Sequence, residues 1–379
     1  MMIRYCSKCV MPNTKPYLKF DKEGVCEACK RHEQKSGDLG EIDWVQRERE
    51  FEELVEWART QDAPTYDAMV PVSGGKDSIT QVHRLLGKGL RILAVNVDYG
   101  VKTDIGDRNL ECIPKMGANL LIFRPNMELH KKLLRIGFEE YGDPDLLSHT
   151  LLHAYPLHIA LSLGIPLALL GENSAFEYGG PEEIANSKRM TEDWFSRYAE
   201  NSGVKASAVC AKYSISSAKL WQYEYPKHLK QAAIEPVFCS YYFPWDSESH
   251  FEIAKKYGFE ALKEPREGTY RTYVGIDEMI NRVHQYLKVL KLGYGRATDH
   301  ACEDIRNKRI SREDAIELVS EYDLEPLGDD FVINVSEFLG YSKNQFIEIM
   351  ERYRNKKIWR TNPKGDWYIE RDFSMGANF

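Results

Sequence analysis

Residues 68–78 read Ala-Met-Val-Pro-Val-Ser-Gly-Gly-Lys-Asp-Ser. The apolar half predicts a buried strand, and the polar half predicts a turn that runs into the start of a helix. Two adjacent glycines, Gly74 and Gly75, let the chain turn tightly and bring backbone N–H groups against an anion, while the helix adds the positive end of its dipole. The stretch therefore predicts a phosphate-binding loop.

Two common nucleotide-binding motifs do not fit this loop. A Walker A motif needs glycine where Val70 stands, and it needs serine or threonine where Asp77 follows Lys76. A dinucleotide fingerprint is also missing, because Gly293-Tyr-Gly295 is followed by Thr298 where the third glycine belongs. Another class of phosphate-binding loop is therefore indicated.

The six residues Ser73-Gly74-Gly75-Lys76-Asp77-Ser78 resemble the PP-loop of the ATP pyrophosphatases, which include GMP synthetase, NAD synthetase, asparagine synthetase and tRNA thiolases. The next β-rich run, 90–97, ends in Asp98-Tyr99-Gly100 and is similar to the strand ending beside the adenosine in this family. The resemblance implies that the loop holds the pyrophosphate end of ATP and that the bond between the α- and β-phosphates is cleaved. Adenylation is then the expected chemistry.

The region around the loop alternates between two patterns. Strand-like runs at 68–72, 90–97, 119–124 and 165–171 are separated by helical patterns that include 104–116, 127–140 and 150–163. This alternation predicts an α/β fold with a doubly wound parallel sheet, in which ligands bind beyond the carboxyl ends of the strands. Glu172 and Asn173 end the last run and are site candidates by position.

Four of the eight cysteines form two Cys-x-x-Cys units, Cys6 with Cys9 and Cys26 with Cys29, separated by sixteen residues. This spacing predicts a zinc ribbon with a structural Zn²⁺, because four thiolates leave no open coordination position. His32 is a spare ligand or a solvated surface residue. The isolated cysteines are predicted to be small core residues: Cys112, Cys210, Cys239 and Cys302.

The composition bounds the possible partners and location. The chain has 379 residues and a net charge of −7, which argues against nucleic-acid binding because phosphate contacts need an excess of Lys and Arg. No apolar stretch is long enough to span a bilayer, and no signal peptide precedes Cys6, so we expect a cytoplasmic protein without membrane insertion.

The remaining patterns predict how the chain is divided into domains. We expect a zinc ribbon at 1–40, a linker helix at 41–65, a PP-loop ATP pyrophosphatase domain at 66–260 and a mostly helical domain at 261–379. In the later part, Asp246 is a predicted N-cap for a helix that reaches Tyr257, and capping boxes begin at Ser311 and Ser342. The stretch 293–300, Gly-Tyr-Gly-Arg-Ala-Thr-Asp-His, is predicted to be a loop that either contacts substrate or simply connects two helices.

Two classes of adenylating enzyme remain open. Some tRNA thiolases combine zinc knuckles with a PP-loop, but they typically need further paired cysteines, and none follows Cys29. Taken with the knuckles and the loop, the Ser240–Asp246 stretch (Ser-Tyr-Tyr-Phe-Pro-Trp-Asp) and the stretch 293–300 make the chain similar to the N-acetyl sugar amidotransferases of bacterial O-antigen (lipopolysaccharide) and flagellin-glycan biosynthesis.

That resemblance implies adenylation of the acetamido oxygen of an N-acetylated sugar, followed by displacement of AMP by ammonia to give an acetamidino sugar. Lys76 and the loop amides are then expected to stabilise the pyrophosphate, and Asp77 to help hold Mg²⁺. Further ATP contacts are expected from Ser73, Gly74, Gly75, Ser78, Asp98 and Glu172.

The ammonia source is expected to be a separate glutaminase subunit. A triad glutaminase needs a cysteine on a Gly-x-Cys-x-Gly elbow, and none of the isolated cysteines is flanked in this way. Position 2 is Met, so an N-terminal cysteine nucleophile is absent as well.

Overall fold

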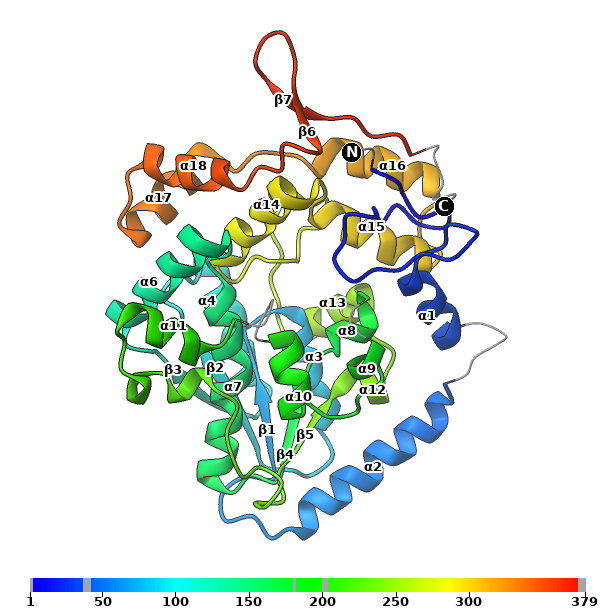
Figure 1. Ribbon diagram of the computed structural model, residues 1–379. Helices are drawn as coiled ribbons and strands as arrows, with labels where there is room; N and C mark the ends of the chain where they lie inside the picture. Colours follow the sequence, from blue (N-terminus) through cyan, green and yellow to red (C-terminus); the bar gives the residue numbers. More distant parts are fainter. Residues whose placement is uncertain (1–2, 37–41, 180–181, 200–203, 374–379) are drawn as a thin grey trace.

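In the computed structural model, which describes residues 3–36, 42–179, 182–199 and 204–373, the predicted phosphate-binding loop, residues 73–78, follows the first strand of a parallel sheet (Figure 1). The strands are β1 (Ala68–Pro71), β2 (Ile92–Val97), β3 (Asn119–Phe123), β4 (Leu167–Leu170) and β5 (Glu235–Phe238). Their order is β3-β2-β1-β4-β5, and every neighbouring pair is parallel. The predicted α/β sheet is confirmed, and β5 adds an edge strand that was not among the predicted runs.

The sheet is covered on both faces, as its buried inner strands β1, β2 and β4 require. On one face, Met69 and Leu93 pack with residues of α6 (Met127–Ile136) and α7 (Leu146–Leu163). On the other, Val70 and Ala94 pack with residues of α2 (Trp44–Thr60), α3 (Lys76–Leu85) and α13 (Ser247–Lys255). The alternation of Met69 and Val70 between two cores is the period-two pattern of a doubly wound sheet.

Shorter elements complete this region. The predicted helix at 104–116 is divided into α4 (Asp104–Leu110) and α5 (Cys112–Lys115), and the one at 127–140 ends in a π-helical turn, η1 (Gly137–Tyr141). The others are α8 (Ser174–Glu177), α9 (Glu182–Ala185), α10 (Glu192–Trp194), η2 (Phe195–Ala199), α11 (Ala206–Tyr213), η4 (Ser217–Lys219), η5 (Trp221–Tyr223) and α12 (Cys239–Tyr242). Asp246 caps α13 as predicted, through a hydrogen bond from the backbone N–H of Ser249.

The carboxyl-terminal region is mostly helical, as predicted. It contains α14 (Ile280–Leu292), α15 (Arg296–Arg306), α16 (Arg312–Tyr322), α17 (Asp329–Leu339) and α18 (Lys343–Arg352), followed by the hairpin β6 (Trp359–Thr361) and β7 (Trp367–Ile369). Both predicted capping boxes are present, at Ser311 and Ser342. Figure 1 shows these yellow to red elements arranged above the sheet, on the side where the phosphate-binding loop lies.

The connection between α14 and α15 is shorter than the loop predicted at 293–300. Gly293 ends α14 in the left-handed conformation, with φ of +76°, and α15 begins at Arg296. Only residues 293–295 therefore connect the two helices, and residues 296–300 are the first turns of α15.

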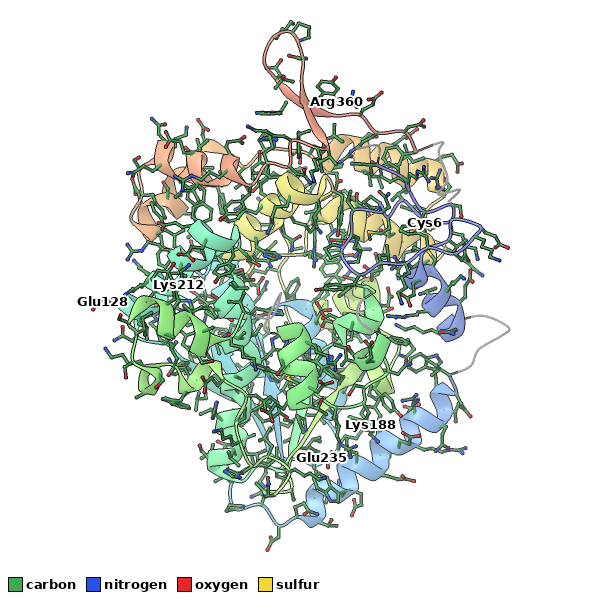
Figure 2. All side chains as sticks on the ribbon, viewed as in Figure 1. Cys6, Glu128, Lys188, Lys212, Glu235 and Arg360 are labelled. Carbon is green, nitrogen blue, oxygen red and sulfur yellow. The ribbon has the colours of Figure 1, made fainter. Side chains whose placement is uncertain are left out.

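The amino-terminal cysteines pack against this region rather than forming a separate lobe. They share an apolar cluster with Ala301 and Cys302 of α15 and with Val319 of α16, and Figure 2 shows Cys6 beside these helices. α1 (Glu27–Ser36) then leads away from the cluster. Within the described ranges, no helix combines the length and the apolar character needed to cross a membrane.

Candidate active site at the phosphate-binding loop

The loop has the backbone shape that its glycines predict. Gly74 has φ of +92°, and Gly75 is the N-cap of α3. A Cβ atom on Gly74 would lie 2.9 Å from the backbone nitrogen of Leu110, so this position needs glycine both for its φ and for the close approach of α4. The N–H of Gly75 donates to Oγ of Ser73 at 3.1 Å, and Oγ of Ser78 donates to the carbonyl of Gly75 at 2.8 Å.

Lys76 and Asp77 form a charged pair at the start of α3. Nζ of Lys76 lies 2.8 Å from Oδ2 of Asp77, and Nδ1 of His250, on α13, lies 2.7 Å from Oδ1. Burial would raise the pKa of Asp77, but Lys76 and His250 together hold it well below its ordinary value. The carboxylate is therefore charged, and both of its oxygens are oriented by neighbours.

A cavity of about 320 Å³ opens in front of the loop. Five of the predicted site residues line this cavity: Ser73, Gly75, Lys76, Asp77 and Glu172. Three others do not line it: Gly74, Ser78 and Asp98. Gly74 and Ser78 lie buried behind the loop and shape it from within. On the far side the cavity is lined by Arg296, Asp299, His300 and Glu303 of α15 and by residues 273–278.

Asp98 directly follows β2, and its carboxylate forms local hydrogen bonds. Its Oδ2 accepts from Nε of Arg124 at 3.0 Å, and its Oδ1 accepts from the N–H of Gly100 at 2.8 Å. Its neighbours Asn96, Val97 and Tyr99 line the cavity instead. A contact of Asp98 with adenosine stays a prediction.

Glu172 and Asn173, at the end of β4, have different surroundings. Burial raises the pKa of Glu172 to about 7, and the nearby Asp77 carboxylate adds to this effect. Asn173 points away from the cavity: its amide nitrogen donates to the carbonyls of Ile184 and Ala185, and its Oδ1 accepts from Nε1 of Trp194. The prediction that Asn173 faces the same cleft is wrong, because its side chain holds the 174–194 segment in place.

A second cavity, of about 240 Å³, adjoins the first. It lies beyond the ends of β1, β4 and β5, where Pro71, Leu170 and Phe238 line it. Ser73, Asp77, His149 and Glu172 line both cavities and so form a common wall.

The four predicted metal ligands lie together. The sulfurs of Cys6, Cys9, Cys26 and Cys29 are all within 4.8 Å of one another, and all four residues are buried. Sγ of Cys6 also accepts backbone N–H groups from Cys9 and Cys26, at 3.4 and 3.2 Å. Four converging, buried sulfurs fit a tetrahedral structural ion.

The predictions for His32 and for the isolated cysteines have different outcomes. His32 is not part of the four-sulfur group, and it is half-buried rather than solvated. Cys112, Cys239 and Cys302 are buried, as core residues should be. The side chain of Cys210 lies outside the described residues.

Residues 267–372 match the model of the C-terminal domain of WbpG-like LPS biosynthesis proteins. This part of the chain is therefore similar to that domain, and we call residues 267–372 the WbpG-like domain. A search of curated proteins found no match to the chain.

The WbpG-like domain supplies site residues of two kinds: residues of the stretch 293–300, for which a substrate contact was one of two open interpretations, and acids that the sequence patterns did not predict. It contributes Arg296 and His300 to the cavity, together with two adjacent acids, Asp277 and Glu278. Burial raises the pKa of Asp277, and burial and the Asp277 charge raise that of Glu278 to about 7. Burial, together with the Glu278 carboxylate, also raises the pKa of Asp145, which lines the same cavity, well above its ordinary value.

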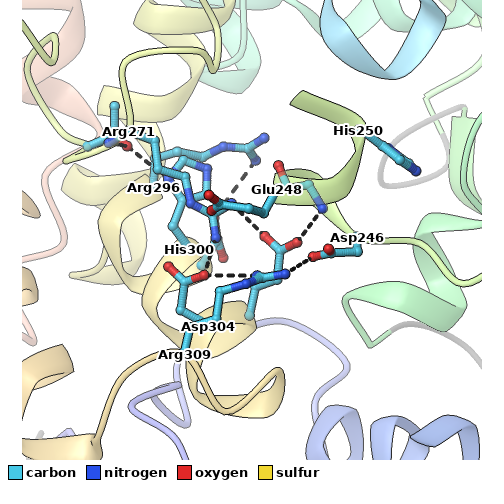
Figure 3. Close-up of polar contacts among 12 residues, drawn as sticks. Asp246, Glu248, His250, Arg271, Arg296, His300, Asp304 and Arg309 are labelled. Atoms are coloured by element: carbon cyan, nitrogen blue, oxygen red, sulfur yellow. Dashed lines mark hydrogen bonds and ion pairs between the residues drawn. The ribbon is translucent and has the colours of Figure 1, made fainter. Parts of the chain in front are cut away.

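An ion-pair network fastens the WbpG-like domain to the loop region (Figure 3). Arg271, which is 4% exposed, pairs with Glu303 and Asp304 at 2.7 Å each. Glu303 in turn accepts the backbone N–H of Ser247 at 2.9 Å, and Arg309 pairs with Asp246. The network therefore fixes the start of α13, the helix that carries His250 to Asp77.

Proposed function

We propose that this protein is an ATP-dependent amidotransferase. It adenylates the acetamido oxygen of an N-acetylated sugar, and ammonia then displaces AMP to give an acetamidino sugar, AMP and pyrophosphate. The observation that carries the proposal is the shared cavity, which has a phosphate-binding loop on one wall and a WbpG-like domain of LPS biosynthesis proteins on the other.

The wall residues suit the first step. An amide carbonyl is a weak electrophile, so its oxygen must be converted into part of a good leaving group before a nitrogen nucleophile can replace it. The oxygen attacks the α-phosphorus, and the loop N–H groups and Lys76 stabilise the charge that develops on pyrophosphate. Lys76 is only 5% exposed, and this burial strengthens its interaction with an incoming phosphate.

Two metal ions belong to the proposal. Asp77 would hold Mg²⁺ beside the phosphates, because its charged carboxylate lines the cavity and oxygen ligands are those that Mg²⁺ prefers. Bound there, the ion would neutralise phosphate charge. The four-cysteine group would hold Zn²⁺ with a structural role, because all four positions around the ion are filled by sulfur.

Ammonia is proposed to come from a separate glutaminase subunit. A glutaminase nucleophile must be accessible to its substrate, and Cys112, Cys239 and Cys302 are all buried. We also propose that the enzyme is cytoplasmic and has no nucleic-acid partner. The net charge of −7 supports the second point.

The test is to incubate the protein with Mg-ATP, an ammonium salt and a panel of acetamido nucleotide sugars and nonulosonates, and to measure AMP, pyrophosphate and sugar mass together. We expect sugar-dependent AMP and a product in which one oxygen is replaced by NH. Lys76→Ala should lower AMP formation by about a hundredfold or more, while Lys364→Ala, at an exposed hairpin lysine, should not. AMP formation that required tRNA and a sulfur donor would instead support the thiolase alternative.

A further inference from the structure

The second cavity is separate from the WbpG-like domain. It is lined by the ends of the strands, by α3 and α7, and by Gly171, Glu172, Ser174 and Met190, and none of its lining residues lies within 267–372. Its common wall with the first cavity includes Asp77, His149 and Glu172. A small molecule in the second cavity therefore lies next to the loop without occupying the space that faces the WbpG-like domain.

Gln81 gives this cavity an unusual polar group. It lies on α3 and is only 5% exposed, yet its Oε1 has no hydrogen-bond partner among the described residues. Its amide fits against Gly171, where a Cβ atom would lie 3.0 Å from Nε2. Buried acceptors are almost always satisfied, so Oε1 is an unmet hydrogen-bond acceptor on a residue that lines this cavity.

Further acceptors line the cavity, beside the hydroxyls of Ser73, Ser78 and Ser174, which can both donate and accept. Nδ1 of His153 lies 2.8 Å from the carbonyl oxygen of His149, which only accepts, so Nδ1 carries the hydrogen. Burial lowers the pKa of His153, and in the neutral ring the other nitrogen is an acceptor. The carboxylates of Asp77 and Glu172 are charged acceptors in the same lining, and the apolar part of the lining includes Leu170, Met190 and Phe238.

We propose that the second cavity binds ammonium and delivers its nitrogen through the common wall to the substrate in the first cavity. The inference rests on the proposed function and names the site of its third reactant. Ammonium is small, carries only N–H donors and is positively charged, which matches a set of amide, imidazole and carboxylate acceptors.

The common wall also contains a group that can accept the proton lost by ammonium. Ammonium must lose one proton before its nitrogen has a lone pair, and the Glu172 carboxylate can accept that proton. The lone pair then forms the C–N bond to the adenylated carbon, and a second proton leaves the nitrogen for solvent. The C–O bond breaks with its electron pair on the departing AMP oxygen, and an amidinium remains.

The closing experiment separates the two half-reactions. Sugar-dependent exchange of pyrophosphate into ATP reports adenylation and needs no ammonia, whereas amidine formation from ammonium chloride reports the complete reaction. For Gln81→Leu we expect the KM for ammonium to rise about tenfold, the loss of one hydrogen bond, with exchange unchanged. Gln222→Leu is the matched control, because Gln222 is another buried glutamine and it lines neither cavity.

Two further variants keep the test decisive if Gln81→Leu fails to fold. Gln81→Glu keeps the shape and adds a negative acceptor, so the KM for ammonium should fall. Glu172→Gln should slow amidine formation from ammonium by about a hundredfold without slowing exchange, and hydroxylamine, which is largely uncharged at neutral pH, should restore the rate.

The outcomes distinguish the inference from the proposed function. Normal exchange together with an unaltered KM for ammonium in both Gln81 variants would overturn the inference alone. Absence of sugar-dependent exchange in the unaltered protein would overturn the proposed function, and the inference with it.

Discussion

Nδ1 of His250 lies 2.7 Å from Oδ1 of Asp77, so a side chain from α13 orients the carboxylate of the phosphate-binding loop. A carboxylate only accepts hydrogen bonds, and Nδ1 is therefore the donor. The His250 ring is 3% exposed, and the Trp245 ring stands edge-on to it with the centroids 4.5 Å apart. A residue remote in sequence thus sets the geometry of the loop.

We predict that His250→Ala weakens the binding of Mg-ATP by about tenfold, the value of one charge-assisted hydrogen bond. Without the imidazole, Asp77 is free to rotate toward Lys76, which then has less charge to offer a phosphate. His250→Asn places a donor near the position of Nδ1 and should restore most of the affinity. Calorimetric titration of both variants with Mg-ATP measures this, and equal affinities for the Ala and Asn variants would contradict a positioning role.

Gly74→Ala should abolish ATP binding while leaving the fold assembled. The new Cβ would lie 2.9 Å from the backbone nitrogen of Leu110 and 3.0 Å from the carbonyl of Gly106, so the loop or α4 must move. Gly87→Ala is a matched control, because Gly87 also has a positive φ, +74°, but has nothing within 4 Å of the added atom. Both variants carry the backbone cost of about 1 kcal/mol; only Gly74→Ala should lose the binding of a fluorescent ATP analogue.

Arg271→Met should destabilise the protein by about 3 kcal/mol, the lower end for a broken buried ion pair, because Glu303 and Asp304 lose a buried cation while Asp304 keeps its contacts with Arg309 and Tyr270. The comparison is Arg360→Met on the hairpin (Figure 2), whose ion pair with Glu370 at 3.5 Å has both side chains mostly exposed. That pair should contribute about 0–1 kcal/mol. Denaturant unfolding measures both, and similar losses would show that the network in Figure 3 adds little.

Removal of the proposed zinc should loosen α15 as well as the cysteine segment. The cysteines pack on Ala301 and Cys302, and the Arg312 guanidinium donates to the carbonyls of Cys9 and Cys6 at 3.3 and 3.4 Å. Cys26→Ser should lose the metal and speed hydrogen exchange in α15, the helix that forms the far wall of the cavity. Cys112→Ser, outside the group, should keep the metal content measured by mass spectrometry.

The sequence predicted the parts of the site that local patterns define. The loop follows from six contiguous residues, and four of the strands follow from continuous apolar runs. β5 was missed because it is a four-residue edge strand that contains Pro236, a residue that strand patterns exclude. Arg296 was assigned to a loop because Gly295, Thr298 and Asp299 have low helix propensity, which tertiary packing overrides.

The missed site residues share a physical cause. His250 meets Asp77 across 173 positions of sequence, and Arg271 meets Glu303 across 32, so no spacing rule connects the partners. Asp277 and Glu278 have raised pKa values only because the folded chain buries them together beside the loop. Burial of this kind has no local sequence signal, whereas a phosphate-binding turn does.

Glu172→Gln should make the protein more stable above pH 7 even as it impairs the reaction. Burial raises the pKa of Glu172 from 4.5 to about 7, so between these values the folded protein keeps a proton that the unfolded chain has lost. Stability therefore falls as the pH rises through this window, and the penalty is complete above it. Glutamine cannot titrate, so the variant escapes the fall: its melting temperature should match that of the unaltered protein below pH 4.5 and exceed it above pH 7. The exposed hairpin variant Glu370→Gln serves as the control, and parallel melting curves for Glu172→Gln and the unaltered protein across the whole range would contradict the prediction.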